Sequence, residues 1–501
     1  MRGHLPDYVC DAMEVLAEAG GKPYVVGGAV RDIKMGRVPH DYDIASDLLP
    51  DDVIGILQEN KHNRVSVVDN LGNNFGVVVG VFDGNPVEIA TFRSDAYGLT
   101  DAHRPESVSF GVTLEEDLSR RDFTCNAMAL GMDGNFVDPF HGANDIERGY
   151  LCPVAREGHY LEDAEKRYRE DPLRLYRACR FVSQLGFTYS ENRITPASVF
   201  CSVKGFWREC KAQDLSMERV RKEMEKLLLG KYPKEGLMLL MESGLVDAPC
   251  LSRRDGTKTY VSPLQSLAHL YGLPQNPKHH RFDAWGHTVE AVTNIGRTLP
   301  LRYAALFHDV GKGLEGVRGE KNGQPTDHGH EKMSASIVFG SLCDGFGYNK
   351  RFARDVQWIV RNHMDFMNLI DADSKQVKRW VRNKAKGFRK QKDLVEGIAC
   401  LREMFRADMS ASRNDTEQIG KMLLNLDVAH SFAERSMPLH SSDLRIDGRK
   451  VKEAADANGL DIAAVYGVLL KQVQDEVVPN DEKSIAVSLR RYVSRQGKEG
   501  R

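Results

Sequence analysis

The sequence predicts an α+β protein with a mixed β-sheet at its start and helices after it. The chain has 501 residues, and because domains average roughly 150 residues, about three are expected. Short β-branched runs separated by glycines dominate the first hundred residues, and from Glu162 onward apolar residues recur at three- and four-residue spacing. This apolar content is sufficient for several buried cores.

The elements follow in order along the chain. A helix is expected over 8–19, because its apolar residues recur every three or four positions. Strands are expected where β-branched residues lie between glycines, at 24–26, 43–45, 64–68, 76–82 and 87–92. Helical periodicity then covers 163–185, 216–229 and 233–243. The polar stretch 250–263 predicts a connector, and 316–329, rich in Gly, Lys and Glu, predicts a loop between later helices.

A glycine turn lies between the first expected strand and a helix expected over 29–35. Gly27 and Gly28 let the backbone approach a ligand closely. Exposed amides at the helix start would attract a triphosphate, and Arg31 adds positive charge. A lone glycine turn is more often only a turn, so this feature needs support from its surroundings.

That support comes thirteen residues after Gly28, where Asp41 and Asp43 flank Tyr42. On a strand, the two carboxylates share one face. Two acceptor-only groups suit a hard divalent cation such as Mg²⁺, which can activate a hydroxyl and bind a leaving pyrophosphate. The combination predicts metal-assisted nucleotidyl transfer with Asp41 and Asp43 as catalytic ligands. Glu88 is a weaker candidate for a third carboxylate, since a glutamate on an edge strand facing water explains it equally.

These residues resemble motif A of the class II tRNA nucleotidyltransferases, the CCA-adding enzymes, and of the related bacterial poly(A) polymerases. Further motifs follow in the family's order: 87–93 after the carboxylates, 118–129 as motif B, 138–151 as motif C and 169–181 as motif D. The resemblance spans nearly the whole chain. It implies a polymerase-β-type nucleotidyltransferase head with a mixed sheet, followed by an all-α neck, a body and an HD-type helical domain.

Asp171 and Arg174 of motif D carry a chemical argument of their own. A helix opened near Pro172 would place their side chains on one face. The carboxylate accepts hydrogen bonds and the guanidinium donates them in a fixed fork. Cytosine and adenine present an amine donor beside a ring acceptor, whereas uracil and guanine present the reverse. The pair would therefore select C and A without a template; the alternative is a surface helix crossed by ion pairs.

The resemblance implies nucleotide-binding roles for Gly28, Arg31, Arg121, Asp122, Asn126, Asp171, Arg174, Arg177 and Arg180. In this set Arg121, Asp122 and Asn126 are candidates for triphosphate and ribose contacts. Asp171 and Arg174 would read the base, while Arg177 and Arg180 would hold nucleotide or framework. Motif B also admits a structural interpretation, in which Asp122 caps a helix and Asn126 is satisfied internally, and both roles can hold together.

A second group of metal-ligand residues lies far downstream: His287, His308, Asp309, His330, His363 and Asp408. Their order resembles the HD superfamily of metal-dependent phosphohydrolases. A mixed nitrogen and oxygen shell suits Ni²⁺, Mn²⁺, Co²⁺ or Mg²⁺, and His330 with His363 could hold a second ion. A lone histidine in a helical bundle is usually only a core or surface residue. The resemblance implies an accessory phosphohydrolase acting on nucleotide ends, and leaves open whether the site is active.

The net charge is only −2, so contact with RNA would need a local patch. The clearest candidate is the basic run Lys375, Lys378, Arg379, Arg382, Lys384, Lys386, Arg389, Lys390 and Lys392, with Trp380 and Phe388 interleaved. It predicts a tRNA phosphate contact or, equally, a solvated helix face. Nine scattered cysteines and the lack of a signal or membrane-spanning segment predict a cytoplasmic protein with no membrane partner.

The resemblance divides the chain into four parts: a catalytic head over 1–150, a helical neck over 151–250 that recognises nucleotide and RNA, an HD domain over 251–430 and a helical tail over 431–501 that contacts tRNA. Three features depart from the family, one of them in the tail, where Asn458-Gly459-Leu460-Asp461 replaces the usual Pro-Gly-Pro run. Cys152 stands where relatives usually carry arginine, and 155–162 is a short insertion. Cys152 and the insertion lie near motif C, which is associated with the switch from C to A addition.

The predicted function is template-independent addition of C, C and A to tRNA 3′ ends from CTP and ATP, with an accessory phosphohydrolase. A poly(A) polymerase is the nearest alternative, although bacterial members typically lack an HD domain and carry a basic C-terminal tail. An HD phosphohydrolase whose head only binds nucleotide or RNA is the second, and a non-enzymatic RNA chaperone the third. The sequence leaves open whether one chain adds all three nucleotides, the oligomeric state, and the substrate and metal of the HD site.

Overall fold

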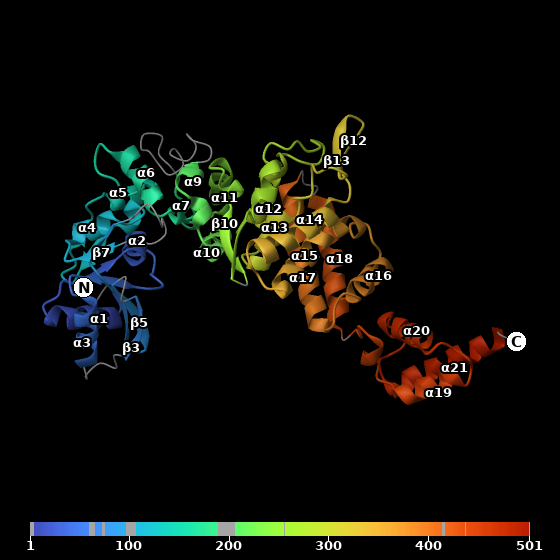
Figure 1. Cartoon of the computed structure of the whole chain (residues 1–501). Coiled ribbons are helices and arrows are strands. Elements are labelled where there is room, and N and C mark those ends of the chain that lie inside the picture. Colours follow the sequence, from blue (N-terminus) through green and yellow to red (C-terminus); the bar gives the residue numbers. More distant parts are fainter. Residues whose placement is uncertain are drawn as a thin grey trace. The chain divides into compact units, whose positions relative to one another are not determined.

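The computed structural model describes residues 5–59, 66–72, 76–96, 107–188, 206–254, 256–412, 416–435 and 437–499. The chain forms two compact units, coloured along the sequence in Figure 1: residues 1–271 with 340–349, and residues 272–339 with 350–501. The predicted α+β class is confirmed, with a mixed sheet in the first part of the chain and helices after it. The division into four domains stays a prediction.

A seven-stranded mixed sheet forms the centre of the head, in the order β3-β4-β5-β2-β1-β8-β9. Its strands are β1 (Tyr24–Val26), β2 (Asp43–Ser46), β3 (Ser66–Gly72), β4 (Val77–Phe82), β5 (Asn85–Thr91), β8 (Ala129–Gly131) and β9 (Phe136–Val137). Strands β2 and β5 pair in parallel and the other pairs are antiparallel. The hairpin β6 (Arg93–Ala96) and β7 (Ser107–Phe110) pairs separately.

Helices α1 (Asp7–Glu18) and α3 (Pro50–Glu59) cover one face of this sheet. Their apolar residues, such as Met13 and Leu57, join Ile44 and Ile89 of the sheet in one core. The helix predicted at the start of the chain is thus confirmed, and its apolar face is the one that packs on the sheet. The short helices α2 (Gly28–Lys34), α4 (Leu114–Ser119) and α5 (Gly142–Arg148) complete the head.

The segment after the head is helical: α6 (Tyr160–Glu170), α7 (Leu173–Leu185), α9 (Phe206–Glu209), α10 (Met217–Leu228) and α11 (Pro233–Glu242). Helix α7 packs against α10 and α11. The single helix expected over 163–185 is wrong, because the chain breaks at Asp171, whose backbone is extended. Proline disfavours helical backbone in the residue before it, and Pro172 follows directly.

Two segments expected to be irregular are β-hairpins. The supposed connector 250–263 contains β10 (Cys250–Arg254) and β11 (Thr257–Val261), paired antiparallel. The supposed loop 316–329 contains β12 (Arg318–Lys321) and β13 (Gln324–Asp327). The turn of the second hairpin is Asn322-Gly323, both with positive φ, which is the usual sequence for a two-residue hairpin turn.

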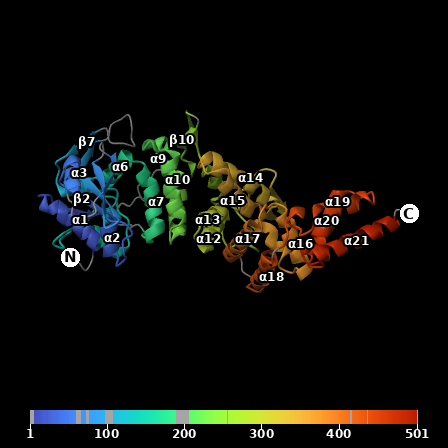
Figure 2. The same ribbon diagram turned by 90° about the horizontal axis from the view of Figure 1, so that it is seen from below.

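The second unit is built from helices: α12 (Ala284–Asn294), α13 (Leu299–Phe307), α14 (His330–Gly340), α15 (Lys350–Asn362), α16 (Ser374–Ala385), α17 (Gln391–Ala411) and α18 (Thr416–Glu434). Helix α17 packs against α12, α13 and α18. The last three helices, α19 (Gly448–Asp456), α20 (Ile462–Gln474) and α21 (Glu482–Glu499), lie side by side in both views and share a core around Val451 and Leu469 (Figure 2). Within the described ranges, no helix has the length and apolar character needed to span a membrane.

Candidate functional site

Three carboxylates gather on the face of the head sheet that α1 and α3 leave uncovered. Asp43 begins β2 and lies in register with Glu88 of the parallel strand β5, and both side chains are exposed. Because β5 lies between β4 and β2, the edge-strand interpretation of Glu88 is wrong. Tyr42 points to the opposite face and packs edge-on against Tyr8, with ring centroids 6.1 Å apart.

The electrostatics of this face favour a cation. Burial, first of all, and the negative charges of Glu88 and Asp41 together raise the pKa of Asp43 to about 6, against the opposing effect of Arg121. Neighbouring carboxylates that raise the pKa of Asp43 are close enough to repel it when it is ionised. A divalent ion removes that repulsion and suits an all-oxygen ligand set. The residues present therefore fit the Mg²⁺ expected from the sequence.

Two arginines flank the glycine turn beside the carboxylates. Gly27 has a φ of 71°, and a Cβ built there would lie 3.1 Å from Nη1 of Arg121. A Cβ on Gly28 would lie 3.5 Å from Nη2 of Arg31, which donates through Nη1 to Oδ1 of Asn126 at 2.8 Å. The structure thus brings these predicted nucleotide-binding residues together around one turn.

Asp122 of motif B is a buried structural anchor. Its Oδ1 accepts from the Phe123 backbone and from Asn126, and its Oδ2 accepts from Nε of Arg177 at 2.7 Å. Burial alone would raise its pKa, but Arg177, Asn126 and Arg174 lower it to about 2. The expected helix cap is absent, because residue Phe123 is the N-cap of the following 3₁₀ turn, Thr124–Asn126. Asn126 is satisfied internally, as the structural interpretation expects.

The predicted Arg177 and Arg180 surround an aromatic ring. The guanidinium carbons of Arg31, Arg177 and Arg180 lie 5.4, 5.4 and 4.0 Å from the centroid of Phe181, which is buried. Arg180 also forms a buried ion pair with Glu223 of α10 at 3.1 Å. Arg180 is therefore part of the framework, whereas Arg177 joins that framework to Asp122.

Sequence reasoning missed Asp117, which holds the two arginines of motif B. Its Oδ1 accepts from Nη2 of Arg120 at 2.7 Å, and its Oδ2 accepts from Nη2 of Arg121 at 3.2 Å. Burial raises its pKa, but the two arginines outweigh this effect and lower it. The sequence did carry a signal for this contact, because Arg120 and Arg121 follow Asp117 by three and four residues at the end of helix α4.

The predicted base readers are held by different partners. Arg174 is buried and donates to the backbone oxygens of Arg167 and Arg120 at 2.9 and 2.7 Å, and to Glu170 at 3.1 Å. Asp171 accepts from the Leu173 backbone and from Arg219. The expected shared helical face is wrong, because Asp171 precedes α7 in an extended conformation. Their base-reading role stays a prediction.

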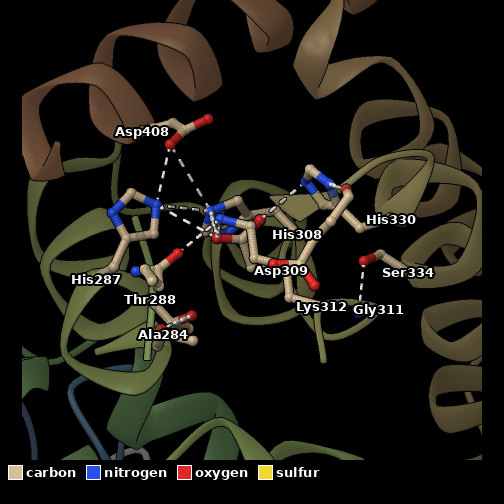
Figure 3. A network of polar contacts seen from close by, with 12 residues as sticks. Ala284, His287, Thr288, His308, Asp309, Gly311, Lys312, His330, Ser334 and Asp408 are labelled. Carbon is tan, nitrogen blue, oxygen red and sulfur yellow. Dashed lines mark hydrogen bonds and ion pairs between the residues drawn. The ribbon is translucent and has the colours of Figure 1, made fainter. Parts of the chain in front are cut away.

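All six downstream metal-ligand candidates are buried and converge in one centre of the second unit, and all but His363 are labelled in Figure 3. They form two groups, His287 with His308 and Asp408, and Asp309 with His330 and His363, each with its ligand atoms within 4.8 Å of one another. Asp309 faces both groups. Its Oδ2 lies 3.3 Å from Nε2 of His308, and its Oδ1 lies 3.1 Å from Nε2 of His330.

Hydrogen bonding in this centre fits a candidate cation site. Nδ1 of His308, His330 and His363 donates to a backbone carbonyl at 2.7, 2.7 and 2.6 Å. A carbonyl can only accept, so the proton of each neutral ring lies on Nδ1 and Nε2 keeps a lone pair. Yet Nε2 of His330 lies 3.1 Å from that of His363. Two lone pairs at this distance repel unless a cation lies between them, and nitrogen with carboxylate donors suits a divalent transition metal.

The two aspartates of the centre are strong anions. Burial raises the pKa of Asp309, but His308 and Lys312, whose Nζ lies 2.6 Å from Oδ2, hold it well below the usual value. Burial also raises the pKa of Asp408, but the hydrogen bond to His287 and the electrostatic interaction with His308 outweigh burial and lower this pKa. Ionised carboxylates are the form that binds metal.

The basic run divides into paired and unpaired cations. Lys378, Arg382 and Lys384 form ion pairs with Glu476, Asp475 and Asp365. An open groove of about 1100 Å³ lies between α16 and α20, lined among others by Lys375, Arg379, Lys386 and Lys471. Among the described residues, these four cations have no ion-pair partner. The interleaved aromatics are structural, because Trp380 is buried and Phe388 packs on Trp358.

The departures near motif C surround a small cavity. Cys152 is buried and lines about 240 Å³ together with His141, Arg156 and Tyr160. Arg156, within the insertion, bonds Asp163 at 2.9 Å. Their effect on the switch between C and A addition stays a prediction.

Comparison with known families agrees with this geometry. The model described as "Poly A polymerase head domain" matches residues 23–152, "Probable RNA and SrmB- binding site of polymerase A" matches 211–252, and "HD domain" matches 286–417. The chain carries a polymerase head and an HD domain. The predicted resemblance is confirmed for these parts.

Curated relatives are CCA-adding enzymes. That of Geobacillus kaustophilus is 42% identical over 230 residues, covering 46% of this chain and 51% of the relative. That of Leuconostoc mesenteroides is 38% identical over 246 residues, covering 48% and 55%. The match thus spans about half the length of each relative.

Solved structures support the fold over a longer stretch. The CCA-adding enzyme of Bacillus stearothermophilus in complex with CTP has a TM-score of 0.65 at 23% identity, covering 98% of both chains. The Thermotoga maritima enzyme complexed with tRNA has a TM-score of 0.57 at 18% identity, covering 97% of this chain and 95% of that one. The likeness at this identity concerns the fold alone.

We expect one divalent ion in each ligand group of the HD centre. In a chain carrying Asp41→Asn and Asp43→Asn, metal analysis after dialysis against Mn²⁺ or Ni²⁺ should detect both ions. His330→Ala should lose the ion of its group, and Asp309→Ala should weaken both, because Asp309 faces both groups. His328→Ala, two residues away and exposed, is the control. An unchanged metal content in His330→Ala would contradict the assignment.

Asp122→Asn tests the buried charge of motif B. The pKa of Asp122 is about 2, below its ordinary 3.8, so its ionised form stabilises the folded head fully above pH 4, and this is lost as the pH falls through 2. Such a shift is worth about 2 kcal/mol. We expect Asp122→Asn to lower the free energy of unfolding by that amount at pH 7, with the difference from wild type narrowing below pH 4. Hydrogen exchange of head amides in urea measures it, with exposed Asp133→Asn as control; a constant difference would refute this origin.

Proposed function

We propose that this chain adds C, C and A to the 3′ end of tRNA from CTP and ATP without a template, releasing pyrophosphate. The observation that carries the proposal is the juxtaposition of Asp43 and Glu88 with a glycine turn flanked by Arg31 and Arg121. Carboxylates for divalent cations lie beside guanidinium groups for phosphates, which is the arrangement that phosphoryl transfer requires. The curated relatives named above are CCA-adding enzymes.

The residues of the head divide the work. Asp41 and Asp43, with Glu88 as a further candidate, would hold Mg²⁺, which supplies activation of the attacking hydroxyl and neutralises charge on the leaving group. Arg31 and Arg121 bind the triphosphate through charge-assisted hydrogen bonds. As the tRNA 3′ oxygen bonds to the α-phosphorus, the bond to the β-phosphate oxygen breaks and pyrophosphate leaves.

Base selection in the proposal falls to Asp171 and Arg174. The carboxylate accepts from the exocyclic amine of C or A, and the guanidinium donates to the adjacent ring nitrogen. Uracil and guanine would place a carbonyl against the carboxylate and an N–H against the guanidinium. A site built for hydrogen bonds penalises such unpaired groups strongly.

The HD centre supports an accessory phosphohydrolase. Its two buried ligand groups would hold divalent ions such as Ni²⁺, Mn²⁺, Co²⁺ or Mg²⁺, which can generate a hydroxide at neutral pH. Phosphate esters at nucleotide ends are the proposed substrates. A cytoplasmic location belongs to the same proposal and agrees with described cysteines that are free thiols.

The groove between α16 and α20 is the proposed tRNA phosphate contact of the second unit. Lys375 and Arg379 lie about one turn apart on α16, Lys386 follows about two turns later just past its end, and Lys471 lines the same groove from α20. Unpaired cations bind polyanions by releasing counterions, whereas paired ones gain little. The ion pairs of Lys378 and Arg382 with the end of α20 hold the groove together.

The reaction is tested with tRNA lacking its 3′ end and with CTP alone, ATP alone, or both. We expect C addition from CTP alone and a full end only from the mixture, read on a product-length gel. Asp43→Asn should lower addition at least 100-fold while retaining Mn²⁺-dependent phosphatase activity, and Asp309→Asn should do the reverse, because each loses one ligand set. Long tails from ATP alone would indicate a poly(A) polymerase, and hydrolysis without any addition an HD phosphohydrolase with a binding head.

The groove is tested by Arg379→Glu with Lys471→Glu. We expect tRNA affinity to fall about tenfold at moderate salt. A plot of the logarithm of the tRNA association constant against the logarithm of salt concentration should become less steep by about 2, since two phosphate contacts are lost. The control is Lys452→Glu with Lys483→Glu, which changes the net charge equally at exposed tail positions. Equal effects in both double variants would show that total charge matters and that the groove does not.

A further inference from the structure

The carboxylate of Asp171 is held by an arginine that lies outside the motif. Nη2 of Arg219, on α10, donates to Oδ2 of Asp171 at 3.0 Å and reaches Oδ1 at 3.3 Å. The backbone N–H of Leu173 donates to Oδ1 at 3.1 Å. These contacts fix the plane of the carboxylate from two sides. Each carboxylate oxygen has two lone pairs, so Oδ2 retains one for a ligand.

Asp171 needs such an anchor because no secondary structure fixes it. It lies between α6 and α7 with φ of −141° and ψ of 100°. Its side chain is 20% exposed, so packing alone does not select one rotamer. A carboxylate that rotates freely would present either a lone pair or open space to an incoming base.

Arg219 in turn stands on a rigid support. Helix α10 begins with Ser216, whose hydroxyl accepts from the Arg219 backbone N–H. One turn further along, Glu223 forms a buried ion pair with Arg180 of α7. Helices α7 and α10 pack against each other. The position of Arg219 relative to Asp171 is therefore set by the helix pair and does not depend on a loop.

We propose that Arg219 is a specificity-determining positioning residue. It holds the Asp171 carboxylate as an oriented, charged acceptor that receives the amine of C or A and repels the carbonyl of U or G. The inference rests on the proposed function, since it concerns base selection in that reaction. Arg174, the second proposed base reader, is held separately, because it is hydrogen-bonded to Arg120, Arg167 and Glu170. Discrimination between bases therefore depends on Arg219, which positions Asp171, and on the separate contacts that position Arg174.

The test compares kcat/KM for CTP and UTP on tRNA lacking its 3′ end. Arg219→Gln should lower the CTP preference by 10- to 100-fold, mainly by raising UTP use, because a mobile acceptor no longer opposes the uracil carbonyl. Arg219→Lys keeps a cation and should retain most of the preference. The control is Arg221→Gln on the same helix, whose guanidinium contacts the backbone oxygens of Phe346 and Gly347.

Two kinetic outcomes would overturn the inference. One is an unchanged CTP preference in Arg219→Gln; the other is an equal loss with every nucleotide, which indicates a merely structural role. CTP and UTP affinities measured without tRNA separate this failure from failure of the proposed function. If wild type adds no nucleotide but Arg219→Gln still narrows its binding preference for CTP, the proposed reaction fails and the inference holds. If wild type binds both nucleotides equally, the inference fails.

Discussion

Repulsion between like groups is the constraint on which both centres depend. In the head, Asp41, Asp43 and Glu88 bring negative charge onto one face, and burial together with the charges of Glu88 and Asp41 raises the pKa of Asp43 to about 6. In the second unit, imidazole lone pairs face one another about 3.1 Å apart inside a buried core. Folding alone would not favour either arrangement. Divalent cations convert both repulsions into coordination, so the two sites are most easily explained as metal centres that the rest of each unit holds in place.

Around the head centre, aspartates and arginines form one connected framework. Asp117 binds Arg120 and Arg121, and the backbone oxygen of Arg120 accepts from Arg174. The arginine beside the glycine turn is thereby linked to the arginine proposed to read the base. Asp122 makes a second link, through Asn126 to Arg31 and directly to Arg177. Since removing one member of a buried network leaves its partners unpaired, the proposed phosphate binding and the proposed base recognition should respond together to such changes.

The sequence predicts what depends on local spacing and misses what depends on distant packing. The carboxylates of motif A, the glycine turn and the adjacent His308 and Asp309 follow from short patterns, and the structure brings each set together. The sequence could not decide whether Glu88 lies on an edge strand or beside the carboxylates. That depends on β5 lying inside the sheet, which only the order of strand pairing decides. Arg219 lies 48 residues from Asp171, and only the packing of α7 on α10 joins them. The missed hairpin at 318–327 did carry a local signal, its Asn322-Gly323 turn.

Each metal centre is complete within its own unit. Every carboxylate and arginine of the head site lies in residues 1–271, and every ligand of the HD centre lies in the second unit. Neither chemistry needs a side chain from the other, so loss of one ligand set should leave the other electrostatically intact. Coordination by tightly buried groups also resists small displacements, since close-packed cores do not deform continuously. Under the proposed function, coupling between the two centres would therefore pass through a substrate that reaches both, and the proposed tRNA substrate has the length and charge for this.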